Sequence, residues 1–95
     1  MRVITNRRLA EFAAKHPEAR APLQAWRRAM ELHVFSSFNA LRQQFASVDR
    51  VGDLYVFNIG GNKYRLIAFL HSAHQVAYIK HVLTHAEYDK GAWKK

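Results

Sequence analysis

Apolar residues recur at helical spacing in the first half of the chain. Three of them follow the i, i+3, i+4 rule and predict a first helix that begins after Thr5 or Asn6: Leu9, Phe12 and Ala13. Four more share one face of a second helix: Leu23, Trp26, Met30 and Val34. This second helix begins at Pro17 or at Pro22, because proline suits the first turn of a helix. Ser37 is expected to cap a third, short helix that carries three apolar positions: Phe38, Leu41 and Phe45.

From about residue 51 the spacing becomes that of strands. Residues 54–59 are β-branched, aromatic and apolar, and they lie between Gly52 and the pair Gly60-Gly61. Two successive glycines suit the positive φ angles of a hairpin turn, so residues 63–70 are expected to return as a second strand. Residues 75–83 form a third strand after a polar turn. With a very short strand at residues 3–4, this order predicts one α+β domain over residues 1–95, its N-terminal helices packed on a small antiparallel sheet.

Alternation along the strands assigns side chains to the two faces of this sheet. Lys63 and Arg65 point to one side of their strand, and four residues point to the other: Tyr64, Leu66, Ala68 and Leu70. On the last strand, one face carries Val76, Tyr78, Lys80 and Val82, opposite Ala77, Ile79 and His81. If the helices cover one face, the cationic side chains of Arg65 and Lys80 are expected to meet on the other, partly open face.

The charge of the chain narrows the class of partner. Among 95 residues, 15 are Lys or Arg and 7 are Asp or Glu, a formal net charge of +8. Such a field attracts polyanions without reading their sequence, so nucleic acid is the leading partner class. An anionic membrane surface is the weaker alternative. The third possibility is a basic surface that is simply solvated and binds no partner. There is no cysteine, which excludes disulfides and thiolate metal sites.

Charges or histidines interrupt every apolar segment, so none reaches the length of a transmembrane helix. The first eight residues also lack the apolar run of a signal peptide. We therefore expect a cytoplasmic protein.

The segment after the last strand is dense in ionisable groups: Thr84-His85-Ala86-Glu87-Tyr88-Asp89-Lys90. We expect it to fold back toward the strands that carry Arg65 and Lys80. Such a set suits cleavage of RNA without a metal, because fixed cations stabilise the charge that gathers on the phosphate in the transition state. A histidine can transfer the proton, and a tyrosine can donate a hydrogen bond, act as a weak acid or stack on a base.

The same residues also have plain structural interpretations. Thr84 followed three residues later by Glu87 is the capping-box pattern, which starts a helical turn. Tyr88 and Trp93 can simply pack the C-terminal segment on the sheet. Two further histidines can pair on zinc, but without two more ligands at suitable spacing they are better read as solvated turn residues: His71 and His74. No metal site or cofactor is predicted.

Two runs of the sequence resemble the HigB-type toxins of the RelE superfamily. The first is Val56-Phe57-Asn58-Ile59-Gly60-Gly61-Asn62-Lys63-Tyr64-Arg65-Leu66-Ile67. The second is Tyr78-Ile79-Lys80-His81-Val82-Leu83-Thr84-His85-Ala86-Glu87-Tyr88-Asp89-Lys90. The resemblance covers essentially the whole chain. It implies a RelE-like fold and a ribosome-dependent mRNA endonuclease that inhibits translation. It also implies a hetero-oligomer with a HigA-type helix-turn-helix antitoxin as partner.

The resemblance also implies site residues. Arg65 and Lys80 are expected to bind the scissile phosphate, His85 is the main candidate for proton transfer, and Tyr88 assists as an acid or stacks on the mRNA base. Four residues are expected to contact RNA in a secondary role: Asn62, Lys63, Asp89 and Lys90. Asp89 can also orient His85 or Tyr88.

The sequence leaves two other functions open. A non-catalytic RNA-binding module would use the same basic sheet only to hold a nucleic-acid backbone. A DNA-binding regulatory subunit is the weaker alternative, since the basic residues are spread along the chain and no helix-turn-helix pattern is present.

Overall fold

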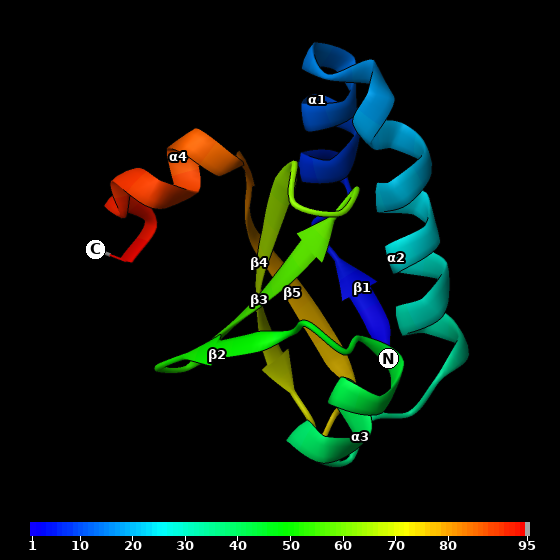
Figure 1. The fold of residues 1–95 in the computed structure, drawn as a ribbon. Helices are drawn as coiled ribbons and strands as arrows, with labels where there is room; N and C mark the ends of the chain where they lie inside the picture. The colour runs from blue at the N-terminus through cyan, green and yellow to red at the C-terminus, as the bar shows by residue number, and fades with distance from the viewer. Residues whose placement is uncertain (95) are drawn as a thin grey trace.

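Five strands form one sheet in the order β1-β5-β4-β3-β2 in the computed structural model, which describes residues 1–94 (Figure 1). The strands are β1 (Arg2–Ile4), β2 (Asp49–Val51), β3 (Leu54–Ile59), β4 (Tyr64–His71) and β5 (Val76–Thr84). The run from β3 to β5 is the antiparallel meander that the sequence predicts, and β2 adds a further antiparallel strand beside β3. β1 pairs with the first residues of β5 in parallel, so the complete sheet is mixed. The α+β, RelE-like fold class is confirmed.

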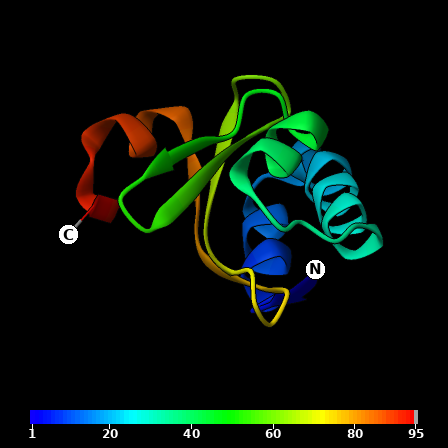
Figure 2. The ribbon, with the colours of Figure 1, turned by 90° about the horizontal axis from the view of Figure 1, so that it is seen from below.

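Helices lie on both sides of this sheet. They are α1 (Arg7–Lys15), α2 (Arg20–Leu32), α3 (Phe38–Gln44) and α4 (His85–Lys90), with two 3₁₀ turns, η1 (Pro17–Ala19) and η2 (Ala92–Lys94). Figure 2 shows α1, α2 and α3 together on one side of the sheet and α4 on the other. The face that the three N-terminal helices leave free therefore carries the C-terminal segment.

The helix boundaries show where each of the two prolines lies relative to the second helix. Pro17 begins the 3₁₀ turn η1, and Pro22 is the third residue of α2, where a backbone N–H has no partner within the helix. Ser37 caps α3 as predicted, because its Oγ accepts a hydrogen bond from the Ala40 N–H at 3.1 Å. Asn6 stands at the cap position of α1, but its side chain donates to the Val3 carbonyl instead.

Val34 does not share the apolar face of the second helix, contrary to the prediction. The helix α2 ends at Leu32, and the following segment is extended, so the helical spacing no longer applies. Val34 is 76% exposed, whereas Met30, one helical turn earlier, is fully buried. The sequence does not predict the strand β2, because two of its three residues, Asp49 and Arg50, are charged and leave no apolar pattern.

The sheet has an apolar core on each face. The core on the helix side is the larger, and Trp26 meets Phe57 within it edge to face, with ring centroids 5.3 Å apart. The core on the other face consists of three buried residues, Val56, Ile67 and Trp93. We call this side of the sheet the open face. Trp93 comes from η2, so the end of the chain supplies the largest side chain of this second core.

A β-bulge shifts the register between β4 and β5. Ile67 pairs with His81, but Ala68 pairs with Ile79, so Lys80 is an extra residue in β5. In a bulge of this kind two residues of one strand oppose a single residue of the other. Lys80 and His81 therefore both lie opposite Ile67, a residue of the open face.

The bulge corrects the predicted faces of the last strand. Val82 packs against the core on the helix side, and Leu83 packs against the core of the open face. Val82 therefore shares a side with Ile79 rather than with Lys80, and His81 lies on the side opposite to the one predicted. Strict alternation fails here because one inserted residue reverses every later assignment.

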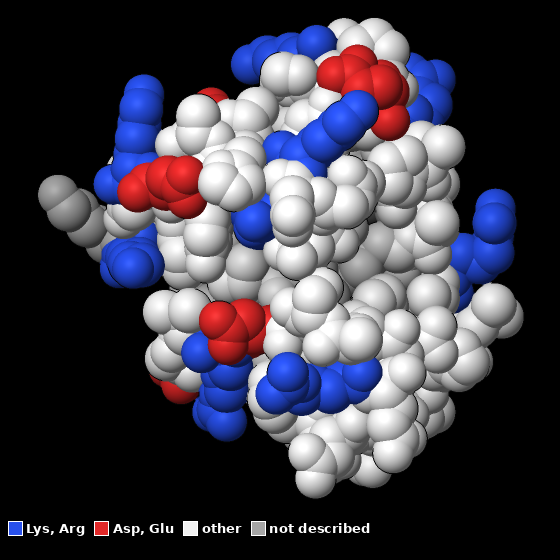
Figure 3. All heavy atoms as spheres, in the orientation of Figure 1, with Lys and Arg blue, Asp and Glu red and all other residues white. Residues whose placement is uncertain are grey.

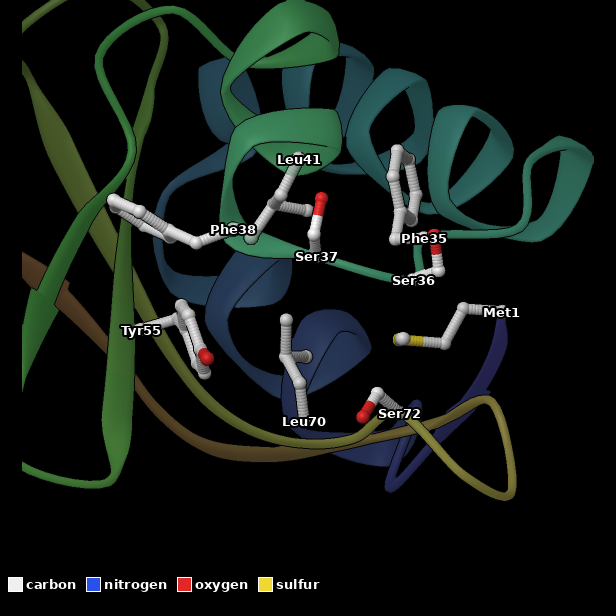
Figure 4. Close-up of a pocket in the computed structure, with 9 residues that line it drawn as sticks. All are labelled: Met1, Phe35, Ser36, Ser37, Phe38, Leu41, Tyr55, Leu70 and Ser72. Carbon is white, nitrogen blue, oxygen red and sulfur yellow. The ribbon is translucent and has the colours of Figure 1, made fainter.

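A hollow lies between the start of α3 and the end of β4, on the helix side (Figure 4). Phe38, Leu41, Tyr55 and Leu70 form its apolar walls. This hollow is separated by the sheet from the segment that carries α4. Among residues 1–94, no helix is both long and apolar enough to span a membrane.

The contact between Tyr64 and Glu18 predicts a pH dependence of stability. The Tyr64 hydroxyl donates a hydrogen bond to Glu18 and joins η1 to β4. This bond lowers the pKa of Glu18 below its ordinary value of 4.5, because it favours the charged carboxylate. The stabilisation of the fold by this hydrogen bond is thus complete above about pH 4.5. It is lost as the pH falls through the lowered pKa of Glu18.

Tyr64→Phe should therefore destabilise the protein more at pH 7 than at pH 3. Urea unfolding of both proteins at the two pH values measures this difference. If the difference in unfolding free energy between the parent protein and Tyr64→Phe is the same at both pH values, the charged carboxylate does not have this role.

Candidate active site

The helix α4 is only six residues long, and both of its ends are fixed by side-chain or backbone bonds. The Thr84 hydroxyl accepts a hydrogen bond from the Glu87 N–H at 3.2 Å, and the Glu87 carboxylate accepts one from the Thr84 N–H at 2.9 Å. Gly91 ends the helix in the left-handed conformation, with φ of 75°. The predicted capping box is confirmed, and it fixes the start of the short helix that carries His85, Tyr88 and Asp89.

The turn between β3 and β4 binds both the sheet and α4. Its two glycines take the positive φ angles that the sequence predicts, 62° at Gly60 and 69° at Gly61. The Asn62 carbonyl accepts a hydrogen bond from Arg65 Nη1 at 3.2 Å, and the Lys63 carbonyl accepts one from the His85 N–H at 3.1 Å. One turn thus positions both Arg65 and the first residue of α4.

Arg65 lies against the ring of Tyr88. Its Cζ atom is 5.4 Å from the ring centroid, a cation–π contact, and Nη1 also donates to the Tyr64 carbonyl at 3.1 Å. Both carbonyl bonds of Arg65 use Nη1. Among residues 1–94, Nε and Nη2 therefore have no hydrogen-bond acceptor. The guanidinium can use these two nitrogens as donors to a phosphate.

His85 and Asp89 contact each other within α4. His85 Nδ1 and Asp89 Oδ2 are 3.0 Å apart, and the two side chains are 51% and 61% exposed. A carboxylate beside Nδ1 favours the tautomer with its proton on that nitrogen, which leaves Nε2 able to accept a proton from a ligand. The expectation that Asp89 orients His85 thus has a geometric basis.

Lys80 lies farther from this cluster than the sequence led us to expect. Arg65 pairs across the sheet with Leu83, and Lys80 is three residues back along β5, roughly 10 Å at the usual rise of a strand. The structure thus brings Arg65 together with Tyr88, and His85 with Asp89, but Lys80 can approach them only through its long, exposed side chain.

Sequence reasoning missed His81, which the bulge turns to the open face. His81 lines a hollow beside the cluster together with Leu83, Glu87, Lys90 and Trp93. Burial lowers the pKa of His81 below 6.5, and the charges of Arg8 and Lys80 lower it further. This imidazole is therefore neutral at neutral pH. Only the position of the bulge identifies it, and no local pattern in the sequence marks a bulge at Lys80.

His71 and His74 lie at the far end of β4 from Arg65. Their rings stack 4.4 Å apart in the turn between β4 and β5. Among residues 1–94, no three His, Asp or Glu side chains gather as the ligands of a metal ion.

Basic side chains are spread around the rim of the face seen in Figure 3, with fewer acidic ones between them.

Comparison with known proteins identifies the family. The family described as HigB toxin, the RelE-like toxic component of a toxin–antitoxin system, matches residues 19–91. The mRNA interferase toxin HigB of Escherichia coli strain K12 is 36% identical over 92 residues, which is 94% of this chain and 88% of that protein. The mRNA interferase HigB of E. coli O6:H1 strain CFT073 is 31% identical over 93 residues, 95% of this chain and 90% of that protein. This chain therefore belongs to the HigB family of RelE-like toxic components of toxin–antitoxin systems.

Proposed function

We propose that this protein is a ribosome-dependent mRNA endonuclease that inhibits translation. The observation that carries this proposal is the cluster on the open face, where the Arg65 guanidinium lies 5.4 Å from the Tyr88 ring centroid beside the His85–Asp89 pair. The name mRNA interferase, borne by relatives that span nearly the whole chain, supports it. An RNA substrate also suits the net charge of +8.

In the proposed reaction, the ribose 2′-hydroxyl attacks the adjacent phosphorus and the 5′-oxygen leaves. The 2′-oxygen loses a proton as the P–O bond forms, and the departing 5′-oxygen gains one, which gives a 2′,3′-cyclic phosphate and a 5′-hydroxyl. Negative charge gathers on the phosphate oxygens in the transition state. Donors that are fixed in advance stabilise this charge most, and Arg65 is held by two carbonyls and the Tyr88 ring.

The other residues take roles that follow from their positions. His85, oriented by Asp89, accepts the proton of the 2′-hydroxyl, and Tyr88 protonates the 5′-oxygen or stacks on the base. Lys80 contacts the phosphate backbone along β5. Three residues around the cluster bind RNA in a secondary role: Asn62, Lys63 and Lys90.

Cleavage of mRNA on programmed ribosomes, with the ends of the products mapped, tests the proposal. We expect fragments that end in a cyclic phosphate or a 3′-phosphate. Ends with a 3′-hydroxyl would point to metal-dependent chemistry and exclude this mechanism. Binding to ribosomes without any cleavage would instead identify a non-catalytic RNA-binding module.

The proposed partner is a HigA-type antitoxin, which binds the protein and neutralises it in a hetero-oligomer. Membership of a toxin–antitoxin family supports an antitoxin partner. The proposed site of action is the cytoplasm, where ribosomes translate. Co-expression with the product of an adjacent helix-turn-helix gene should abolish cleavage and yield a stable complex.

The capping box of α4 gives a prediction that separates stability from activity. Thr84→Ala removes the hydroxyl that caps the helix carrying His85 and Tyr88, and such a change costs about 1 kcal/mol of unfolding free energy. Ser37→Ala removes the equivalent cap of α3, on the helix side, at a similar cost. Only Thr84→Ala should also lower the cleavage rate of the folded protein.

Urea unfolding measures the two stability losses, and the cleavage assay measures the two rates at a temperature where both variants are folded. Equal rates for Thr84→Ala and Ser37→Ala would show that the start of α4 does not position the reacting groups.

A further inference from the structure

We propose that Trp93 is a positioning residue for the cleavage reaction: it fixes Tyr88 and, through Tyr88, the guanidinium of Arg65. This inference rests on the proposed function and adds to it a residue that neither of the two family-like runs contains. Trp93 lies in η2, after the helix α4 has ended, and it reaches back to the open face.

Trp93 is held firmly on the sheet. Its side chain is only 6% exposed, and it packs with Val56 and Ile67, which are 3% and 0% exposed. These three residues are the buried members of the open-face core, so Trp93 supplies most of the apolar surface that attaches η2 to the sheet. A side chain buried to this degree has a fixed orientation.

Trp93 makes two separate contacts with Tyr88. The two rings stack with centroids 5.2 Å apart and planes inclined by 14°. The indole Nε1–H also donates a hydrogen bond to the Tyr88 carbonyl at 3.0 Å. The stack fixes the plane of the Tyr88 ring, and the hydrogen bond fixes its backbone. Together they hold the ring more rigidly than the partly buried position of Tyr88 alone would.

The orientation of Tyr88 in turn constrains Arg65. The guanidinium lies 5.4 Å from the Tyr88 ring centroid, and its other contacts, to the Asn62 and Tyr64 carbonyls, involve only Nη1. Without a fixed ring beside it, the guanidinium can turn about that nitrogen. Since misplacement of a reacting group by about 1 Å can cost 10²-fold in rate, the loss of Trp93 should slow the chemical step.

The chain offers a matched control, because it contains two tryptophans and each lies in a different core. Trp26 is 3% exposed and packs against Phe57 on the helix side, away from Arg65 and Tyr88. Replacing either tryptophan with leucine keeps an apolar side chain in its core while removing the ring. Any effect of lost packing alone should appear in both variants.

The experiment measures kcat and KM for cleavage on programmed ribosomes at a temperature where circular dichroism shows each variant folded. Trp93→Leu should lower kcat by about 10²-fold with little change in KM. Trp93→Phe, which keeps a ring for the stack, should recover most of the rate. Trp26→Leu should reduce thermal stability but keep the kcat of the parent protein. If folded Trp93→Leu retains the parent kcat, or loses no more than Trp26→Leu, the inference is wrong.

A second measurement does not depend on activity. The ¹H–¹⁵N signal of Arg65 Nε, identified by its loss in Arg65→Lys, should be shifted by the Tyr88 ring in the parent protein. It should lose this shift in Trp93→Leu and keep it in Trp26→Leu. If the parent protein does not cleave mRNA, the proposed function fails. The Arg65 signal then decides the positioning separately, and an unchanged signal in Trp93→Leu overturns it.

Discussion

Arg65→Ala is expected to lower the rate of mRNA cleavage by about 10²- to 10³-fold, the usual loss when one fixed donor to a transition-state anion is removed. The guanidinium is held by the Asn62 and Tyr64 carbonyls and lies over the Tyr88 ring, so it needs no reorganisation when charge develops on the phosphate. The measurement is kcat on programmed ribosomes, together with growth arrest when the variant is expressed in cells.

Arg50 provides the control for this substitution. Its Cζ atom lies 5.6 Å from the Tyr55 ring centroid, so it makes the same type of contact as Arg65 in another part of the sheet. Arg50→Ala removes one positive charge and one cation–π contact but should leave kcat nearly unchanged. The two variants should also share the thermal stability of the parent within a few degrees and bind the antitoxin equally. Full toxicity of Arg65→Ala at equal expression would show that the phosphate is bound elsewhere.

The parts of the fold that depend on local spacing were predictable from the sequence. The strand β3 has the predicted bounds, because β-branched and aromatic residues fill it and glycines border it on both sides. β4 and β5 begin and end within one residue of the predictions. The caps at Ser37 and Thr84 also follow from short patterns. Each of these features is decided by residues that are neighbours in the chain.

Features that depend on distant residues were not predictable. The three residues of β1 pair in parallel with β5, more than seventy positions away in the sequence. Neither strand carries a sequence pattern that indicates this pairing. The bulge at Lys80 follows from how β5 fits β4, and it moves His81 to the face opposite to the one that alternation assigns. A single inserted residue therefore places His81 in the lining of the hollow beside the site.

The two family-like runs show how separate motifs form one site. In the sequence, Asn62-Lys63 and His85 are more than twenty residues apart. In the structure, the turn after β3 binds Arg65 through the Asn62 carbonyl and α4 through the Lys63 carbonyl. These bonds use the backbone, and the side chains of Asn62 and Lys63 stay exposed. The conformation of this turn, which its two glycines permit, is thus what sets the distance between Arg65 and His85.

His85→Ala is expected to lower kcat by about 10²- to 10⁴-fold, the range for loss of a general acid–base group, with little change in KM or in stability. The side chain is half exposed, and its contact is the 3.0 Å pair with Asp89, so its removal should leave the core intact. Asp89→Asn should give a smaller loss, because the amide can still accept the Nδ1 hydrogen bond but no longer favours the imidazolium that forms when the 2′-proton is taken up.

Two other histidines make this prediction specific. His74, in the turn at the far end of β4, is exposed, and His74→Ala should cleave like the parent protein. His81 is the informative comparison, because it faces the hollow next to the site and its lowered pKa keeps it neutral and able to accept a proton. If His85→Ala keeps the parent kcat while His81→Ala loses it, proton transfer belongs to the strand β5 and not to α4. If both variants fall, two imidazoles share the acid and base steps, and only their separate pH profiles can assign each step.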